Sequence, residues 1–347
     1  MSDPLSYRSA GVDIDTADRT KEDMAESLRS SDPRVLNSLG AFASLFDARF
    51  PGYKEPVLVL KIEEPGSKQK LAFRFGLLES LCRDLVNHLV NDIAVMGARP
   101  LAVQDVIVCG KLERPRVGEL VRGMAQACRE LGCSLVGGET SEQPGVVPAG
   151  TYILAASVVG VVERSLVVDG SAIRPGDALL ALGSNGLHTN GYSLVRALID
   201  RDPGLLERRV GDESFRDAIM KPHTSYLRAL EGLFGDRALH GMAHITGGGI
   251  EGNLRRVLPP EVDALIELGS VRVLPVFDLI RRAGGVADGD MLKTFNLGVG
   301  LVAAVDPAAA ERVSAHLAAH GTLCYRIGSV QPGSGRVLFS GTLRVGG

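Results

Sequence analysis

Apolar and polar positions divide most of the chain into short apolar runs and longer stretches of helical period. Apolar or β-branched runs predict strands at 57–62, 101–108, 133–136, 151–162, 178–182, 262–268, 297–305, 324–329 and 336–345. Apolar residues at helical spacing predict helices at 76–97, 116–131, 194–200, 225–233, 252–257, 276–283 and 307–320. Because helices alternate with strands in both halves, the sequence predicts an α/β (α+β) fold built from two mixed α/β domains.

The boundary between the two predicted domains falls in a turn-rich stretch. At 347 residues the chain is long for a single core, so two domains are expected. Residues 170–177 contain Pro175 and Gly176 and form the best linker candidate. The first 30 residues are polar with few apolar anchors. We therefore predict a partly mobile N-terminal arm at 1–40, an N-terminal domain at 41–168 and a C-terminal α/β domain at 169–347.

Composition narrows the class of protein. A net charge of −3 gives no electrostatic case for binding nucleic acid. No run approaches the ~18 apolar residues of a membrane helix, and the polar N-terminus lacks the apolar core of a secretory signal. The five cysteines are odd in number and form no C-x-x-C pair, which favours a reducing compartment. The sequence thus predicts a cytoplasmic protein that binds neither nucleic acid nor membrane.

Three glycine-rich segments, 136–142, 183–193 and 244–249, carry polar side chains suited to chemistry. Glycines let the backbone approach a ligand, and the helix predicted after 183–193 offers unpaired N–H groups to an anion. His188 suits acid–base catalysis or donation to phosphate, with a histidine satisfied by loop backbone as the alternative. For His244, a site role and a structural role are equally open. Together these segments predict an enzyme that handles phosphate.

Candidate metal-binding carboxylates occur on one predicted helix, beside a glycine pair, and in a charged segment after a predicted strand. Asp84, His88, Asn91 and Asp92 form a polar stripe on the helix predicted at 76–97, either a solvated face or a Mg²⁺ or substrate site around Asp92. Glu139 lies beside Thr140 and could hold Mg²⁺, although a capped turn is the alternative.

The charged segment 63–70 follows a predicted strand, which is a usual ligand position in α/β folds. Its Lys68 could neutralise phosphate as a point charge, but an exposed hairpin of charges fits equally well. The spacing of a P-loop is absent.

These segments together resemble the phosphoribosylformylglycinamidine cyclo-ligase family, also called aminoimidazole ribonucleotide synthetase, over nearly the whole chain. The marks of the resemblance are the segments 6–7, 10–15, 90–92, 110–112, 135–140, 183–196, 244–249, 256–259 and 294–300. The resemblance implies an enzyme that uses ATP and Mg²⁺ to close formylglycinamidine ribonucleotide to aminoimidazole ribonucleotide, releasing ADP and phosphate, in purine biosynthesis. It also implies a ligand cleft between two α/β domains and a homodimer paired through strands of the N-terminal domain, which would bind ATP.

With this resemblance, residue roles become specific expectations. Glu63, Asp92 and Glu139 are expected near the metal, Lys68 on phosphates, and His188 as acid or base, so that His188, Lys68 and Asp92 form the catalytic set. The expected ribonucleotide contacts are Asn190, Gly191, Ser193, His244, Thr246 and Gly248. The expected nucleotide contacts are Asp13, Glu63, Gly66, Ser67, Asp84, Gly137, Gly138, Glu139 and Thr140.

One segment departs from the family pattern. Where the family usually has Thr-Asp-Gly-Val-Gly-Thr-Lys, residues 62–68 read Ile-Glu-Glu-Pro-Gly-Ser-Lys, so Glu63 takes the aspartate position and Lys68 keeps the lysine. Glutamate is longer than aspartate by one methylene, which would require a shifted backbone to keep the metal geometry. The departure leaves two other functions open: a kinase or synthetase of the same superfamily, and a catalytically inactive paralogue that kept the fold.

Overall fold

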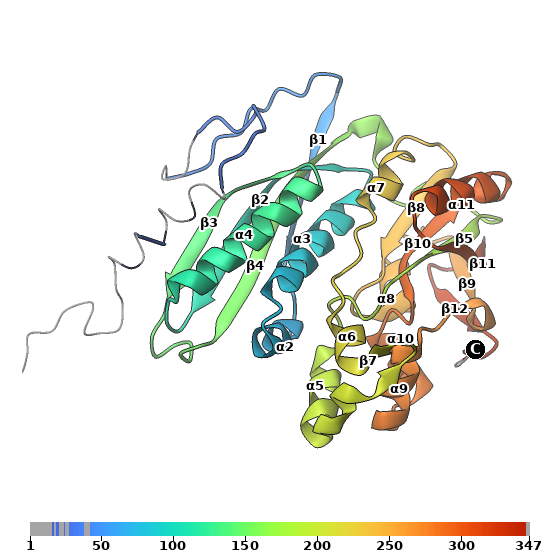
Figure 1. The fold of residues 1–347 in the computed structure, drawn as a ribbon. Coiled ribbons are helices and arrows are strands. Elements are labelled where there is room, and N and C mark those ends of the chain that lie inside the picture. The colour runs from blue at the N-terminus through green and yellow to red at the C-terminus, as the bar shows by residue number, and fades with distance from the viewer. Residues whose placement is uncertain (1–15, 17–18, 21–23, 25–27, 38–41, 345–347) are drawn as a thin grey trace, which may run out of the picture.

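The computed structural model describes residues 16, 19–20, 24, 28–37 and 42–344, which form two main β-sheets with helices packed against them (Figure 1). The first sheet has the strand order β1-β4-β2-β3 and the second has β12-β9-β11-β5-β10-β8. Buried apolar side chains of both sheets belong to one continuous cluster. The mixed α/β fold predicted from the sequence is confirmed. Asp13, an expected nucleotide contact, lies outside the described residues.

The first sheet is a layer covered on one face by helices. Its elements are β1 (Pro56–Glu63), α2 (Lys68–Phe75), α3 (Leu78–Ala94), β2 (Arg99–Cys109), α4 (Arg114–Glu130), β3 (Ser134–Glu142) and β4 (Tyr152–Glu163). β4 runs antiparallel to β1 and β2, whereas β2 and β3 are parallel because α4 returns the chain between them. Helices α3 and α4 pack against each other and lie over the same face (Figure 1).

The opposite face of this sheet is apolar; Phe46, Phe50 and Tyr53 cover the part around Leu101 and Val161, and other side chains of the face are exposed. Side chains alternate between the two faces of a strand, so every second residue of β1 points away from α3. Leu58, Leu60 and Ile62 are 54%, 71% and 67% exposed. Val106 of β2 and Ile153 of β4 are also exposed. A contiguous apolar surface of this kind marks an interaction face.

The second sheet is antiparallel apart from one parallel edge pair, β9 with β12. Its strands are β5 (Ala178–Gly183), β8 (Leu239–His244), β9 (Val262–Glu267), β10 (Val299–Val305), β11 (Cys324–Pro332) and β12 (Val337–Ser340). The accompanying helices are α5 (Tyr192–Arg201), α6 (Phe215–Met220), α7 (Leu227–Glu231), α8 (Gly249–Leu254), α9 (Pro275–Gly284), α10 (Asp288–Thr294) and α11 (Ala310–Ala319). A short hairpin pairs β6 (Arg209–Val210) with β7 (Glu213–Ser214), and 3-10 turns span Arg164–Leu166, Pro203–Glu207, Leu268–Ser270 and Pro307–Ala309.

Several elements differ from the sequence expectation. The segment 137–140, predicted as a ligand loop, lies inside β3, because β2 pairs with this strand as far as Glu142. Helix α8 begins at Gly249, three residues before the predicted start, and the sequence did not predict α2, α6, α10 or the β6–β7 hairpin. No helix in the described part of the chain combines the length and apolarity needed to cross a membrane.

Candidate functional site

Three of the predicted segments meet where the two sheets face each other. Lys68, at the start of α2, donates to the carbonyl oxygen of His188 across 3.2 Å. A Cβ added at Gly66 would lie 2.9 Å from the carbonyl oxygen of Thr189, and Gly66 has φ 63°, so only glycine suits this close approach. The side-chain oxygen of Asn190 would lie 3.1 Å from a Cβ at Gly247. Segments 63–68, 188–193 and 244–249 therefore form one surface.

Lys68 does not lie where phosphate binding would require. Its side chain is fully buried, and its Nζ lies 2.8 Å from Oδ1 of Asp84, which is also fully buried. Nζ donates further to the carbonyl oxygen of Lys221. Burial lowers the pKa of Lys68 against the opposing charge of Asp84, and burial raises the pKa of Asp84 to about 6. All three ammonium protons have protein acceptors, so Lys68 and Asp84, both expected near the nucleotide, form a buried ion pair in this structure.

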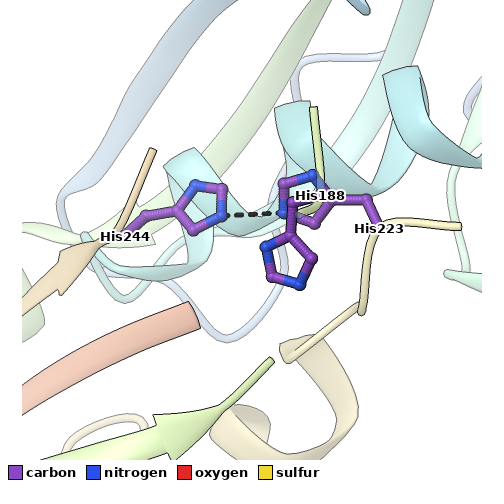
Figure 2. A group of neighbouring side chains, drawn as sticks. All are labelled: His188, His223 and His244. Carbon is purple, nitrogen blue, oxygen red and sulfur yellow. Dashed lines mark hydrogen bonds between the residues drawn. The ribbon is translucent and has the colours of Figure 1, made fainter. Parts of the chain in front are cut away.

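Four histidines form the centre of the site: His88 on α3, His188 after β5, His223 before α7, and His244 at the end of β8. The rings of His188 and His223 stack with centroids 3.8 Å apart. Figure 2 shows His188, His223 and His244 gathered together, with Nε2 of His223 facing Nε2 of His244 at 2.9 Å. All four are buried. Seven histidines occur in the whole chain, so most of them gather at this point.

A chain of charged groups borders the histidines. Asp92 accepts a hydrogen bond from Nδ1 of His244 across 2.7 Å. The ammonium of Lys61 lies 2.7 Å from Glu63 and 3.2 Å from Asp92, so it bridges the two carboxylates. Burial opposes ionisation of Asp92, but the hydrogen bond and charge of His244, with His88 and Lys61, hold its pKa well below the usual range. Asp92 is thus a permanent anion beside the cluster.

The buried imidazoles are held in their neutral form. Burial lowers the pKa of His88 to about 4 and those of His188 and His223 well below the ordinary value, with neighbouring histidines adding to the effect. Among the described residues, neither ring nitrogen of His188 has a hydrogen-bond partner. Neutral imidazoles keep a free lone pair, so they can accept protons or ligate metals.

The expected substrate contacts surround the start of α5. Gly191 caps this helix with φ 81°, and an added Cβ there would clash with the ring of Phe295. Ser193 lies on the first turn, with its Oγ 3.5 Å from Oγ of Ser67. Thr246 bonds to Asn253, and Gly248 has φ 98° at the start of α8. These residues lie in one region of the folded chain. Their spacing in the sequence does not reveal this.

A cationic cavity opens next to Ser67. It has a volume of about 610 Å³ and is lined by Lys70, Arg74, Arg116 and Arg196. Phe73 and Tyr152 stack on its wall with centroids 5.2 Å apart, and the Arg116 guanidinium lies over both rings. Four positive charges and an aromatic surface suit an anionic ligand with a planar ring.

Glu139, expected near the same metal as Glu63, lies apart from Glu63 within one chain. Strand pairing aligns Glu63 with Ala156, Ala156 with Asp105, and Asp105 with Gly138. Glu63 and Gly138 therefore lie on the two edge strands, three strand spacings or roughly 14 Å apart. This distance is too long for Glu63 and a residue next to Gly138 to share an ion in one chain. Gly137, Gly138, Glu139 and Thr140 lie on this far strand, away from the histidines.

Sequence reasoning missed several residues, among them Asp105 and His223. Asp105 is 5% exposed within β2, and burial raises its pKa to about 7; a Cβ at Gly138 would lie 2.3 Å from its Oδ1. His223 follows Pro222 in a stretch without periodicity. An acid inside an apolar strand was a usable signal for Asp105, whereas nothing local distinguished His223.

The fold and the site are those of the AIR synthase related proteins. The family models "AIR synthase related protein, N-terminal domain" and "AIR synthase related protein, C-terminal domain" match residues 58–162 and 174–340. Among solved structures, thiamine-monophosphate kinase from Stenotrophomonas maltophilia has a TM-score of 0.65 at 16% identity, covering 94% of this chain and 96% of that one. A hydrogenase maturation protein HypE in complex with ATP has a TM-score of 0.63 at 20% identity, covering 93% and 90%.

Full-length relatives narrow the class to one family. The phosphoribosylformylglycinamidine cyclo-ligase of Chromobacterium violaceum is 45% identical over 333 residues, covering 95% of this chain and 96% of that protein. The enzyme of the same name from Neisseria gonorrhoeae is 42% identical over 337 residues, covering 96% and 98%. The chain belongs to the phosphoribosylformylglycinamidine cyclo-ligase family, which confirms the resemblance seen in the sequence.

Proposed function

We propose that this chain is an ATP-dependent cyclo-ligase that closes formylglycinamidine ribonucleotide to aminoimidazole ribonucleotide in purine biosynthesis, releasing ADP and phosphate. The observation that carries the proposal is the 45% identity to a cyclo-ligase over 95% of the chain. The likeness to thiamine-monophosphate kinase is below the level that carries function and supports the shared fold alone.

Glu63 and Asp92 are the residues that would hold Mg²⁺. Lys61 now bridges them as a cation between two carboxylates, so the pair already has the charge and spacing to accept one. Carboxylate oxygens are the donors that Mg²⁺ prefers, so the residues fit the ion. Bound Mg²⁺–ATP would supply the phosphoryl group that turns the amide oxygen into a leaving group.

The cationic cavity is the place where the ribonucleotide would bind. Arg196 and Ser67 line it, and Ser193 and the first N–H groups of α5 lie beside it. Guanidinium groups and a helix start both favour a phosphate. Asn190 and Gly191 would position the amide chain of the substrate, together with Thr246 and Gly248 of the facing segment.

The chain contributes mainly positioning and exclusion of water. Ring closure joins two groups of one molecule, so holding them in reacting geometry supplies much of the acceleration. His188, being neutral, would accept a proton at a ring nitrogen when the substrate nitrogen attacks. Lys68 and Asp84 would support this step from behind, since Lys68 fixes the backbone of His188.

Further features of the proposal concern assembly and location. We propose that the chain forms a homodimer through the apolar face of the first sheet, where Leu58, Leu60 and Ile62 are exposed. We also propose domain boundaries at 41–168 and 169–347. The five cysteines are all free, which supports a reducing cytoplasm.

The test is a direct assay of purified protein with ATP, Mg²⁺ and formylglycinamidine ribonucleotide. We expect ADP and aminoimidazole ribonucleotide in equal amounts, and neither product when the ribonucleotide or Mg²⁺ is omitted. An Asp92→Asn variant should lose most of the activity. A folded sample that forms no aminoimidazole product would contradict the proposal, and ADP formation with another phosphoryl acceptor would favour a kinase.

A further inference from the structure

Three imidazoles from separate parts of the chain converge on one point of the interior. One ring nitrogen each from His188, His223 and His244 lies within 4.8 Å of the other two. The three residues are 1%, 1% and 6% exposed. The chain positions are far apart, so this convergence is a product of the fold (Figure 2).

His188 leaves unsatisfied polar atoms inside this cluster. Neither its Nδ1 nor its Nε2 has a hydrogen-bond partner, and Nδ1 of His223 has none. A buried polar group without a partner is unfavourable, and a bound ion is one way to satisfy it. The unpaired nitrogens of His188 and His223 are therefore free to ligate an ion.

Asp92 prepares His244 for that component. It accepts the Nδ1 proton of His244 across 2.7 Å, which fixes the tautomer and leaves the Nε2 lone pair free. That Nε2 accepts a hydrogen bond from Nε2 of His223 across 2.9 Å, so an ion bound by both nitrogens would replace this proton, which can move to the unpaired Nδ1 of His223. A carboxylate behind a histidine is the usual arrangement around protein-bound zinc.

We propose that His188, His223 and His244 form a binding site for a transition-metal ion of the Zn²⁺ type. The proposal goes beyond the cyclo-ligase function and its Mg²⁺–ATP, because imidazole nitrogens select Zn²⁺ and its neighbours, whereas Mg²⁺ prefers oxygen. Three protein nitrogens leave a fourth tetrahedral position open.

To bind the ion, the histidine nitrogens need to move only slightly closer together. Tetrahedral Zn–N bonds of ~2.0–2.1 Å place ligand nitrogens roughly 3.4 Å apart, so the widest pair must approach by at most about 1.4 Å. His188 can turn to do this without breaking a hydrogen bond, since its ring makes none.

The surrounding charges favour a cation. Three carboxylates lie around the histidines, Asp84, Asp92 and Glu63, against two ammonium groups, Lys61 and Lys68. The side chains of Glu63 and Asp92 are 25% and 17% exposed, so they offer a path from solvent. In the metal-bound state His188 is a ligand and is not available as a free base.

The experiment is a Co²⁺ titration of full-length protein that has been stripped with EDTA, without ATP or substrate. We expect saturable visible d–d absorption of tetrahedral intensity at one ion per chain, with no thiolate charge-transfer band. The absence of a thiolate band distinguishes binding by histidines from binding by the five free cysteines. Zn²⁺ should displace Co²⁺ and raise the unfolding temperature, because an ion that binds only the folded state stabilises it.

Three variants and one control make the assignment specific. His223→Gln and His188→Asn should each abolish the visible bands, and Asp92→Asn should weaken Co²⁺ binding by ~10–100-fold through His244. His320→Asn, at an exposed histidine on the distant α11 end, should bind as the parent does. Metal-free unfolding curves show whether each variant is folded.

The absence of saturable d–d absorption in the folded parent would overturn the proposal. Undiminished binding in both His223→Gln and His188→Asn, or a thiolate band, would overturn it too. Because no substrate is present, these outcomes are independent of the cyclo-ligase assay.

Discussion

Lys68 and Asp84 form an ion pair from which water is excluded: Nζ lies 2.8 Å from Oδ1, and neither side chain is exposed. The pair joins the two halves of the molecule, since Lys68 also donates to the carbonyl oxygens of His188 and Lys221. Asp84 in turn accepts from the backbone N–H of His223 across 2.7 Å. Two of the four clustered histidines thus depend on this pair for their backbone position.

Removing one partner should destabilise the protein strongly. Lys68→Met leaves a buried charge without compensation, which typically costs ~3–5 kcal/mol. We expect a loss of that size in the free energy of unfolding, measured by urea denaturation. The double variant Lys68→Met/Asp84→Asn should recover much of it, because Asn is neutral and still accepts from His223. Equal losses in the single and double variants would show that the charge is not the cause.

The buried carboxyl of Asp105 predicts an unusual pH dependence. Burial raises its pKa to about 7 from an ordinary value of 3.8. Between these values the folded state holds more protons than the unfolded state, so this group lowers stability as the pH rises through the window. Asp105→Asn should therefore be more stable than the parent above pH 7, by ~4 kcal/mol at most, and nearly equal to it near pH 4.

Urea denaturation on both sides of this window measures the effect. Asp212→Asn, at an exposed aspartate in the β6–β7 turn, serves as the control and should shift the curves little at either pH. A stability gain for Asp105→Asn that is the same at low and neutral pH would assign the effect to packing rather than to ionisation.

The apolar face of the first sheet predicts a dimer that charge can disrupt. Leu60 is 71% exposed, and burying it against a second copy would favour association by ~1.5–3 kcal/mol. Leu60→Glu should shift the protein from dimer to monomer in size-exclusion chromatography with light scattering. Leu323→Glu, at a leucine 50% exposed outside this sheet, should leave the oligomeric state unchanged. A parent that is already monomeric would contradict the expectation.

The cationic cavity predicts a defect in substrate binding. Arg196 lines it from α5, and a charged hydrogen bond to phosphate contributes ~1.5–3 kcal/mol. Arg196→Ala should raise the KM for the ribonucleotide at least about tenfold, measured by initial rates, with a smaller effect on kcat. Arg201→Ala, on the same helix but outside the cavity, is the matched control. Equal KM values for the two variants would place the phosphate elsewhere.

Secondary structure followed closely from local pattern. The helix expected at 76–97 is α3, and the strand expected at 151–162 is β4, because long periodic stretches report the face that a segment buries. The segment 137–140 was misjudged because glycine pairs indicate a turn locally. In the folded chain β2 supplies the hydrogen bonds that keep them in β3.

Functional residues were harder to predict from the sequence than helices and strands. His188, Asn190 and His244 were singled out from glycine-rich sequence, and the structure does bring their segments together. Lys68 was expected to meet a ligand because a lysine in a charged loop looks exposed. Only the docking of α2 against α3 and the 188–193 segment reveals that it is buried with Asp84.

The sequence by itself determined the α/β alternation, the family and many of the candidate site residues, because these follow from local spacing and collinear motifs. The tertiary structure alone decided which of these residues face one another. It separated Glu139 from Glu63 by the width of a sheet, buried Lys68 with Asp84, and gathered His188, His223 and His244 from three elements. Which side chains become partners depends on contacts between distant segments, and the local pattern of one segment does not reveal those partners.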